Sequence, residues 1–272
     1  MNTSRPKPKL PGNTRVLCLN LAQALGQRRR IKAAEWALDE EEMAYAVHDG
    51  LIDLFRWHDD PRAPQYWKSG AGSREARLMH APLPPDRARH AAKAPEGVID
   101  FSDLGLDKAI AEAEIALRIG APVHPWMAET LTPESALELV HSYAVTIELC
   151  SSRWEEGSAA PTLLKLADLQ SHGALAMGAW HAFKPALLPD WSAQPCSLQV
   201  NDEAPQTSVG THPLGDPAWG LVAWLQHATR HGDPLPAGSV VTTGAWLLRR
   251  GLKAGDRVTA SFDGIGSVEL RV

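Results

Sequence analysis

The pattern of hydrophobic and polar positions divides the chain into a helical first part and a strand-rich second part. Apolar residues at helical spacing predict one helix from Val16 to about Ala34, with Asn13 or Thr14 as its cap. A second helix is predicted to begin at Asp39, because acidic residues fill the first turn of DEEEMAYAVHDGLIDLF and apolar residues follow at helical spacing. We therefore expect a disordered tail at 1–12 and a helical segment at 13–75.

Beyond this segment short apolar strands alternate with turns. Residues 58–98 are rich in Pro, Arg, His and Asp and predict loop with short extended pieces. The strands that follow are VIDF, AEIALRI, YAVTIELC, PCSLQV, GSVVTTG, DRVTASF and GSVELRV. We expect a β-rich catalytic domain at 76–272 and an α+β fold in which a mixed β-sheet roll follows the helices.

Two helices are predicted to interrupt the strands. One starts near Pro133 in TPESALELVHSYA, with Thr132 as its cap. In the other, Asp216 is the cap, Pro217 takes the first helical position and Gly232 closes the end.

Composition and charge narrow the classes of partner. With 272 residues and a net charge of -5, the chain has no basic stripe that could neutralise phosphates, so nucleic acid is not expected. No apolar run approaches the roughly 20 residues that span a bilayer, and the first residues lack a secretory signal. The three cysteines Cys18, Cys150 and Cys196 have neither disulfide nor zinc-knuckle spacing. A cytoplasmic protein without a membrane partner is expected.

Three glutamates carry the first indication of chemistry. In AEAEIALRIG, Glu112 and Glu114 alternate along a strand and so share one face. That pair alone is more simply explained by a solvated strand face. Glu148, however, interrupts the apolar strand YAVTIELC, and a buried carboxylate must be neutral, paired or bound to a metal. Three carboxylates without a His or Cys cluster favour Mg²⁺ or Mn²⁺ over zinc.

These segments also resemble a known family. The order of four motifs resembles that of the 2-keto-4-pentenoate hydratase and oxalocrotonate decarboxylase branch of the fumarylacetoacetate hydrolase superfamily. The motifs are EAEIAL, a strand ending in E-x-x-x-SR, an AD-x-x-S stretch and a Gly-rich VTTG strand. The resemblance covers roughly residues 35–272. It implies the mixed β-roll fold and a metal site formed by Glu112, Glu114 and Glu148.

The resemblance also implies roles for further residues. YWKSG would supply an active-site lysine, Lys68, which either binds the substrate carboxylate or moves protons. Asp168 and Ser171 would approach the site, Asp168 in a catalytic role, and Thr243 and Gly244 would lie near the substrate. The substrate would be a small 2-oxo acid. Apart from the resemblance, the apolar N-terminal helix and the surplus of Trp suggest a homo-oligomer.

The chain departs from the family pattern at three places, so several activities stay open. Ser151 stands where the family has aspartate, Leu169 stands where it has asparagine, and the lysine segment reads WKSGAGS. A hydratase acting on a 2-hydroxydienoate is the first expectation, and decarboxylation of an oxalocrotonate-like acid is the second. An acylpyruvate C–C hydrolase would need a base such as His80, His90 or His124. A catalytically silent metal-binding homologue is the remaining alternative.

Overall fold

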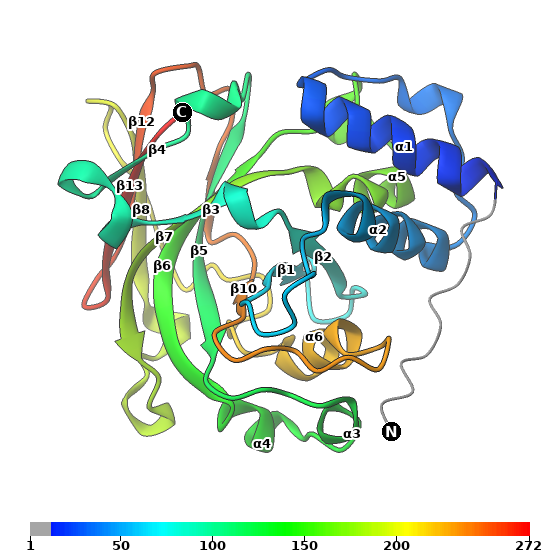
Figure 1. The fold of residues 1–272 in the computed structure, drawn as a ribbon. Coiled ribbons are helices and arrows are strands. Elements are labelled where there is room, and N and C mark those ends of the chain that lie inside the picture. Colours follow the sequence, from blue (N-terminus) through cyan, green and yellow to red (C-terminus); the bar gives the residue numbers. More distant parts are fainter. Residues whose placement is uncertain (1–11) are drawn as a thin grey trace.

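A helical layer covers one side of the molecule. The computed structural model describes residues 12–272, and in it α1 (Gly12–Gln27) and α2 (Glu41–Phe55) pack against each other and, through α2, against the short α5 (Thr162–Ala167), as Figure 1 shows. Leu17, Leu21, Val47 and Leu51 are buried between them. The predicted face of the first helix included Val16 and Leu19, which are instead exposed, and Leu17 takes their place in the core.

The larger of two sheets runs through the centre of the molecule. It has eight strands, seven of them in the order β2-β1-β10-β5-β6-β7-β3. The eighth, β11, pairs with the first half of β5, whereas β10 pairs with its second half. Their bounds are β1 (Tyr66–Gly70), β2 (Met79–Leu83), β3 (Ala88–His90), β5 (Ile110–Ile119), β6 (Val140–Cys150), β7 (His172–Ala182), β10 (Val240–Thr242) and β11 (Leu247–Arg249). The longest strands, β5, β6 and β7, form its antiparallel middle.

The second sheet packs against the middle of the first. It has five strands in the order β4-β13-β12-β8-β9, with the bounds β4 (Val98–Asp100), β8 (Pro195–Val200), β9 (Gln206–Val209), β12 (Arg257–Phe262) and β13 (Gly266–Arg271). β13 contacts β6 and β7, where a Cβ on Gly178 would come within 3.0 Å of the Ser267 carbonyl oxygen. The main apolar core lies between the sheets. The predicted α+β fold, with helices first and a mixed sheet roll after them, is confirmed.

Three short helices lie among the strands, and two of them differ from their prediction. They are α3 (Pro125–Ala128), α4 (Pro133–Leu137) and α6 (Leu221–Ala228). Thr132 caps α4 as predicted, but the long helix through SYA is wrong, because the chain pairs with β5 from Val140 onward. Asp216 accepts a hydrogen bond from the Ala218 amide in a turn, and α6 begins only at Leu221.

The predicted bounds of the N-terminal segments also need correction. The first helix ends at Gln27 rather than Ala34, because Arg28 takes a positive φ of 55° and Ile31 pairs with Trp154 instead. The expected tail falls on residues 1–11, outside the described residues, whereas Gly12 already belongs to α1. β1 precedes the expected boundary at residue 75 yet is a strand of the large sheet. Among the residues described, no helix has the length and apolar character to cross a membrane.

Candidate active site

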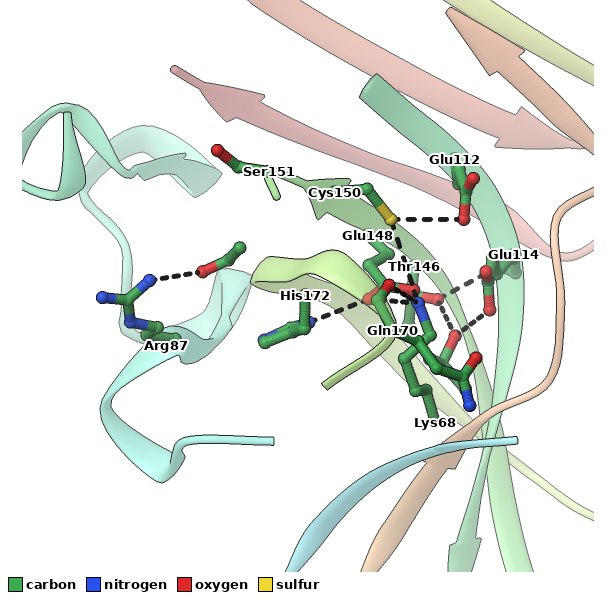
Figure 2. A network of polar contacts seen from close by, with 12 residues as sticks. Lys68, Arg87, Glu112, Glu114, Thr146, Glu148, Cys150, Ser151, Gln170 and His172 are labelled. Atoms are coloured by element: carbon green, nitrogen blue, oxygen red, sulfur yellow. Dashed lines mark hydrogen bonds and ion pairs between the residues drawn. The ribbon is translucent and has the colours of Figure 1, made fainter. Parts of the chain in front are cut away.

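Neighbouring strands bring the three glutamates together. β5 and β6 pair with Glu112 directly opposite Glu148 and Glu114 opposite Thr146. Because alternate residues of a strand share a face, Glu114 lies on the same side of the sheet as this pair. Figure 2 shows the three carboxylates on two adjacent strands, with Lys68 of β1 reaching towards them. The predicted convergence of these four side chains is therefore present in the fold.

Glu148 lies at the centre of the network and is fully buried. Lys68 Nζ lies 2.8 Å from Glu148 Oε1 and 2.7 Å from Oε2, and His172 Nδ1 lies 2.9 Å from Oε1. Burial alone would raise the pKa of Glu148, but the Lys68 ammonium and His172 hold it below its usual value. Burial lowers the pKa of His172 to about 4, so a neutral imidazole donates from Nδ1. Glu148 is thus ionised and paired.

Glu114 has a different environment. It accepts hydrogen bonds from the Thr242 hydroxyl and from the Gly244 amide, the latter at 2.9 Å. Burial first, and then repulsion from Glu148 and Glu112, raises the pKa of Glu114 to about 8. Burial foremost, together with repulsion from Glu148, also raises the pKa of Glu112, although Lys68 acts in the opposite direction. Two of the three carboxyl groups therefore resist ionisation unless positive charge is added.

Cys150 joins the same group of side chains. Two residues after Glu148, its thiol lies 3.5 Å from Glu112 Oε2 and 3.9 Å from Lys68 Nζ. Burial raises the pKa of the Cys150 thiol far above its usual range, so the thiol is neutral. Burial by itself would lower the pKa of Lys68, but the acidic groups around it, Cys150 and Glu148 foremost, raise it. Since the thiol is neutral, we attribute this effect to the carboxylates, which keep Lys68 an ammonium.

A cavity of about 240 Å³ opens beside these side chains. Its walls include Lys68, Glu112, Glu114, Cys150 and Gln170, and its remaining lining comes from Ser69, Gly70, Thr242, Gly244 and Ala245. A cavity of this size, with charged groups on one wall, can take a small acid.

The donor set fits a divalent cation. One ligand atom each from Glu112, Glu148 and Cys150 lies within 4.8 Å of the other two, and Glu114 adds a further carboxylate on the same face. Carboxylate oxygens are the preferred ligands of Mg²⁺ and Mn²⁺. A dication would also remove the repulsion that raises the pKa of Glu112 and Glu114.

A left-handed turn positions the cavity wall opposite β5. Leu169, Gln170 and Ser171 have φ angles of 52°, 51° and 62°, a conformation that L-residues seldom adopt in succession. Asp168, which precedes the turn, forms a buried ion pair with Arg153, whose guanidinium also donates to the Asp168 carbonyl oxygen. The Gln170 carbonyl oxygen lies 3.4 Å from Lys68 Nζ. The strained turn thus contributes a backbone acceptor to the lysine.

Four of the eight predicted site residues do not line the cavity. Glu148 is fully buried and reaches the site only through its ion pair with Lys68. Asp168 is bound to Arg153, and the Ser171 backbone bonds to Asp168 and to Ser151. The Thr243 hydroxyl donates to the Ile115 carbonyl oxygen, 2.7 Å away, and lies beside a small apolar void instead. The side chain that reaches Glu114 from this strand is that of Thr242.

Several residues of the site were missed in the sequence. Thr242 precedes Gly244 by two positions, and Cys150 follows Glu148 by two, so strand alternation could have placed both on the cavity face. In the sequence, Cys150 was considered for its spacing from the other cysteines and not as part of this site. Gln170 and His172 gave no such signal, because a turn and a neighbouring strand bring them in. None of His80, His90 and His124, the candidate hydrolase bases, lines the cavity.

Comparisons with known proteins show the family of this chain. Residues 87–272 match the family model described as fumarylacetoacetate (FAA) hydrolase C-terminal. The chain is 30% identical over 183 residues to 2-keto-4-pentenoate hydratase 1 of Dechloromonas aromatica (strain RCB), covering 62% of this chain and 68% of that protein. It is 28% identical over 143 residues to a 4-oxalocrotonate decarboxylase of Pseudomonas sp, covering 52% and 53%.

A solved structure extends the likeness to nearly the whole fold. The 4-oxalocrotonate decarboxylase from Pseudomonas putida G7, complexed with magnesium and adipate, superimposes with a TM-score of 0.75 at 19% identity. The match covers 95% of this chain and 96% of that one. The shared architecture therefore includes the N-terminal helical layer as well as the sheets.

Proposed function

Because this chain belongs to the fumarylacetoacetate hydrolase family, we propose that it is a divalent-cation-dependent hydratase, a lyase that adds water to a small 2-hydroxydienoate or its 2-oxo-4-enoate form, such as 2-keto-4-pentenoate. The observation that carries the proposal is a cavity lined by Glu112, Glu114 and Lys68, with the buried Glu148 paired to Lys68. Such a set can bind a cation and an acid at adjacent points.

The three glutamates would hold the cation, Mg²⁺ or Mn²⁺. When bound, it supplies Lewis-acid stabilisation of the negative charge that develops on the 2-oxygen of the substrate. The Thr242 hydroxyl and the Gly244 amide hold Glu114 in place, and His172 holds Glu148. These contacts fix the direction of the carboxylates, so little reorganisation is needed on binding.

Lys68 would act on the carboxylate end of the substrate. Its ammonium lies in the cavity wall, kept charged by its acidic neighbours, and can donate hydrogen bonds to a carboxylate or pass a proton to carbon. Gly244 would contact the substrate directly. For Asp168, Ser171 and Thr243 the contacts support an indirect role, which is to hold the Gln170 turn and the Thr242 strand in place.

Decarboxylation of an oxalocrotonate-like 2-oxo diacid is the second candidate. It is favoured by the similarity to a 4-oxalocrotonate decarboxylase, and it would use the same cavity. The two reactions differ in the bond that breaks, so the products distinguish them.

The first experiment measures turnover and cation dependence together. The protein is stripped with chelator and dialysed, Mg²⁺ or Mn²⁺ is returned, and the dienol absorbance of 2-hydroxypenta-2,4-dienoate is followed. We expect cation-dependent loss of absorbance that disappears in Glu112→Gln. The exposed Glu129→Gln is the matched control and should keep wild-type turnover.

Other outcomes separate the alternatives. Release of CO₂ from a 2-oxo diacid, without turnover of the dienoate, would favour the decarboxylase. Stoichiometric cation binding without turnover of either substrate would indicate a silent homologue. Absence of cation binding would contradict the proposed centre altogether.

A further inference from the structure

A second cavity, of about 300 Å³, lies beyond the end of β6. Its walls come from the last turn of α1 and the loop after it, from residue 87, from residues 104–107 and from residues 151–153. It shares no lining residue with the carboxylate cavity. In the view of Figure 2, Arg87 lies on the opposite side of His172 from the carboxylates. The two cavities are thus separate spaces at one end of the same strand.

The walls of this second cavity are strongly basic. Five arginines line it, namely Arg28, Arg29, Arg30, Arg87 and Arg153, against one acidic residue, Asp107. Asp168 neutralises Arg153 from outside the cavity. This concentration of positive charge occurs in a chain whose net charge is -5.

The other four arginines have only uncharged hydrogen-bond acceptors within the described part of the chain. Arg28 donates to the Asp103 carbonyl oxygen, Arg29 to the Gln23 side-chain amide and Arg30 to the Asp107 carbonyl oxygen. Arg87 lies deeper and donates, at 3.3 Å each, to the carbonyl oxygens of Gly173 and Leu25.

The surroundings of the Arg87 side chain are unfavourable for a cation. Burial, followed by the neighbouring Arg153, lowers the pKa of Arg87 to about 10. Arg87 is half-buried, and an arginine in such a position usually has an anionic partner, because its desolvation is otherwise uncompensated. The Ser151 and Ser152 side chains, which also belong to this wall, are neutral hydroxyl groups and do not supply that partner.

We propose that this cavity is a binding site for a small polyanion, a molecule with several anionic oxygens such as a phosphate ester or a di- or tricarboxylate. Guanidinium groups bind such oxygens through paired, charge-assisted hydrogen bonds. Arg87 forms the floor of the site, and Arg28, Arg29 and Arg30 form its exposed rim.

The site is connected to the carboxylate cavity through the backbone. The Ile31 amide, next to the arginine loop, donates to the Arg153 carbonyl oxygen at 2.8 Å, and the Glu155 amide donates to the Ile31 oxygen at 2.9 Å. Ser151 directly follows Cys150 of the carboxylate cavity. A polyanion bound between the arginine loop and residues 151–153 would therefore contact the segment that continues β6.

The test is calorimetric titration of the full chain, freed of metal and chelator by dialysis, at constant ionic strength. Pyrophosphate and citrate are the probes and chloride is the reference anion, so the two arms separate phosphate from carboxylate ligands. We expect saturable binding of at least one probe, with an affinity at least tenfold lower in Arg87→Met and in Ser151→Asp. The aspartate would supply an internal carboxylate partner, and Ser151→Asn is its neutral control.

Two further variants keep the test decisive if Arg87→Met fails to fold. Arg29→Met alters only an exposed rim side chain and should weaken binding, whereas Arg62→Met removes an exposed arginine outside the cavity and should not. Absence of binding in the wild type, or equal loss in Arg29→Met and Arg62→Met, would overturn the site. Binding that persists in Glu112→Gln would separate it from the proposed hydratase centre.

Discussion

Glu114 is a buried carboxyl group whose ionisation the fold opposes. Its pKa in the folded chain, about 8, lies above that of an unfolded glutamate, so its stabilising contribution is complete below about pH 4.5 and is lost as the pH rises towards 8. We expect Glu114→Gln to stabilise the metal-free protein by about 1–3 kcal/mol at pH 8, because a neutral amide oxygen can still accept from Thr242 and Gly244.

Urea unfolding at pH 5 and pH 8 measures this effect. The variant should gain little at pH 5, where the wild-type carboxyl is protonated in the folded state. It should also lose the increase in melting temperature that Mg²⁺ gives the wild type. A variant that is less stable than the wild type at pH 8 would contradict the assigned environment.

Lys68 has two roles that a single substitution can separate. In Lys68→Met, Glu148 loses its ammonium partner, so the metal-free protein should be destabilised by about 3–5 kcal/mol. Turnover should fall at least about 100-fold. Mg²⁺ affinity, in contrast, should be unchanged or higher, because a competing cation has been removed from Glu148.

Calorimetric Mg²⁺ titration beside steady-state kinetics tests that separation. Lys184→Met, which alters an exposed lysine, should leave both quantities unchanged. Loss of Mg²⁺ binding in Lys68→Met would mean that the lysine is needed to assemble the centre rather than to act on the substrate.

At the scale of elements, the ion pair between Asp168 and Arg153 holds the left-handed turn against the end of β6. Asp168→Asn would leave a buried guanidinium without its carboxylate, and we expect a loss of about 3–5 kcal/mol in the free energy of unfolding. The same change at Asp103, whose pair with Arg89 is largely exposed, should cost less than about 1 kcal/mol. Denaturant midpoints of the two variants compare them directly, and equal costs would show that the buried pair has no special role.

The elements also show where local patterns were reliable. The strand containing Glu148 and the helix over α2 were predicted because alternation and helical spacing are properties of the local sequence. The ends of α1 and α4 were not, because pairing of Ile31 with Trp154 and of Val140 with β5 overrides the local preference for helix.

At the scale of the whole molecule, buried histidines predict sensitivity to acid. Burial foremost lowers the pKa of His48, His80 and His212 to about 4 each, below the unfolded value near 6.5. Their contribution is complete above pH 6.5 and is lost as the pH falls towards 4, because the unfolded chain takes up the protons. These three histidines should together lower the free energy of unfolding by up to about 5 kcal/mol between pH 7 and pH 5, and the contribution of Glu114, which increases as the pH falls over the same range, should offset part of this loss.

Urea titrations across this range check the expectation. His48→Gln should reduce the slope of the free energy of unfolding against pH by up to about one proton, and an unchanged slope in this variant would refute the expectation.

Assembly remains a prediction at this scale. Val16 and Leu19 of α1 are each about half exposed, at 50% and 49%, and Trp126 is 67% exposed. Apolar surface of this kind favours association, so sedimentation velocity should show a homo-oligomer. A single monomeric species at micromolar concentration would contradict it.

The sequence by itself determined the class of fold and the strands that carry Glu112, Glu114 and Glu148. It also indicated the family, through the motif around Lys68 and the other short motifs, because periodicity and short motifs are local properties. Only the tertiary structure decided that Cys150, Thr242 and Gln170 line the cavity. Only in the folded chain is Asp168 paired with Arg153, and only there do arginines from separate segments line one cavity. Those contacts join segments far apart in the chain, and their positions depend on strand register and packing, which no local pattern specifies.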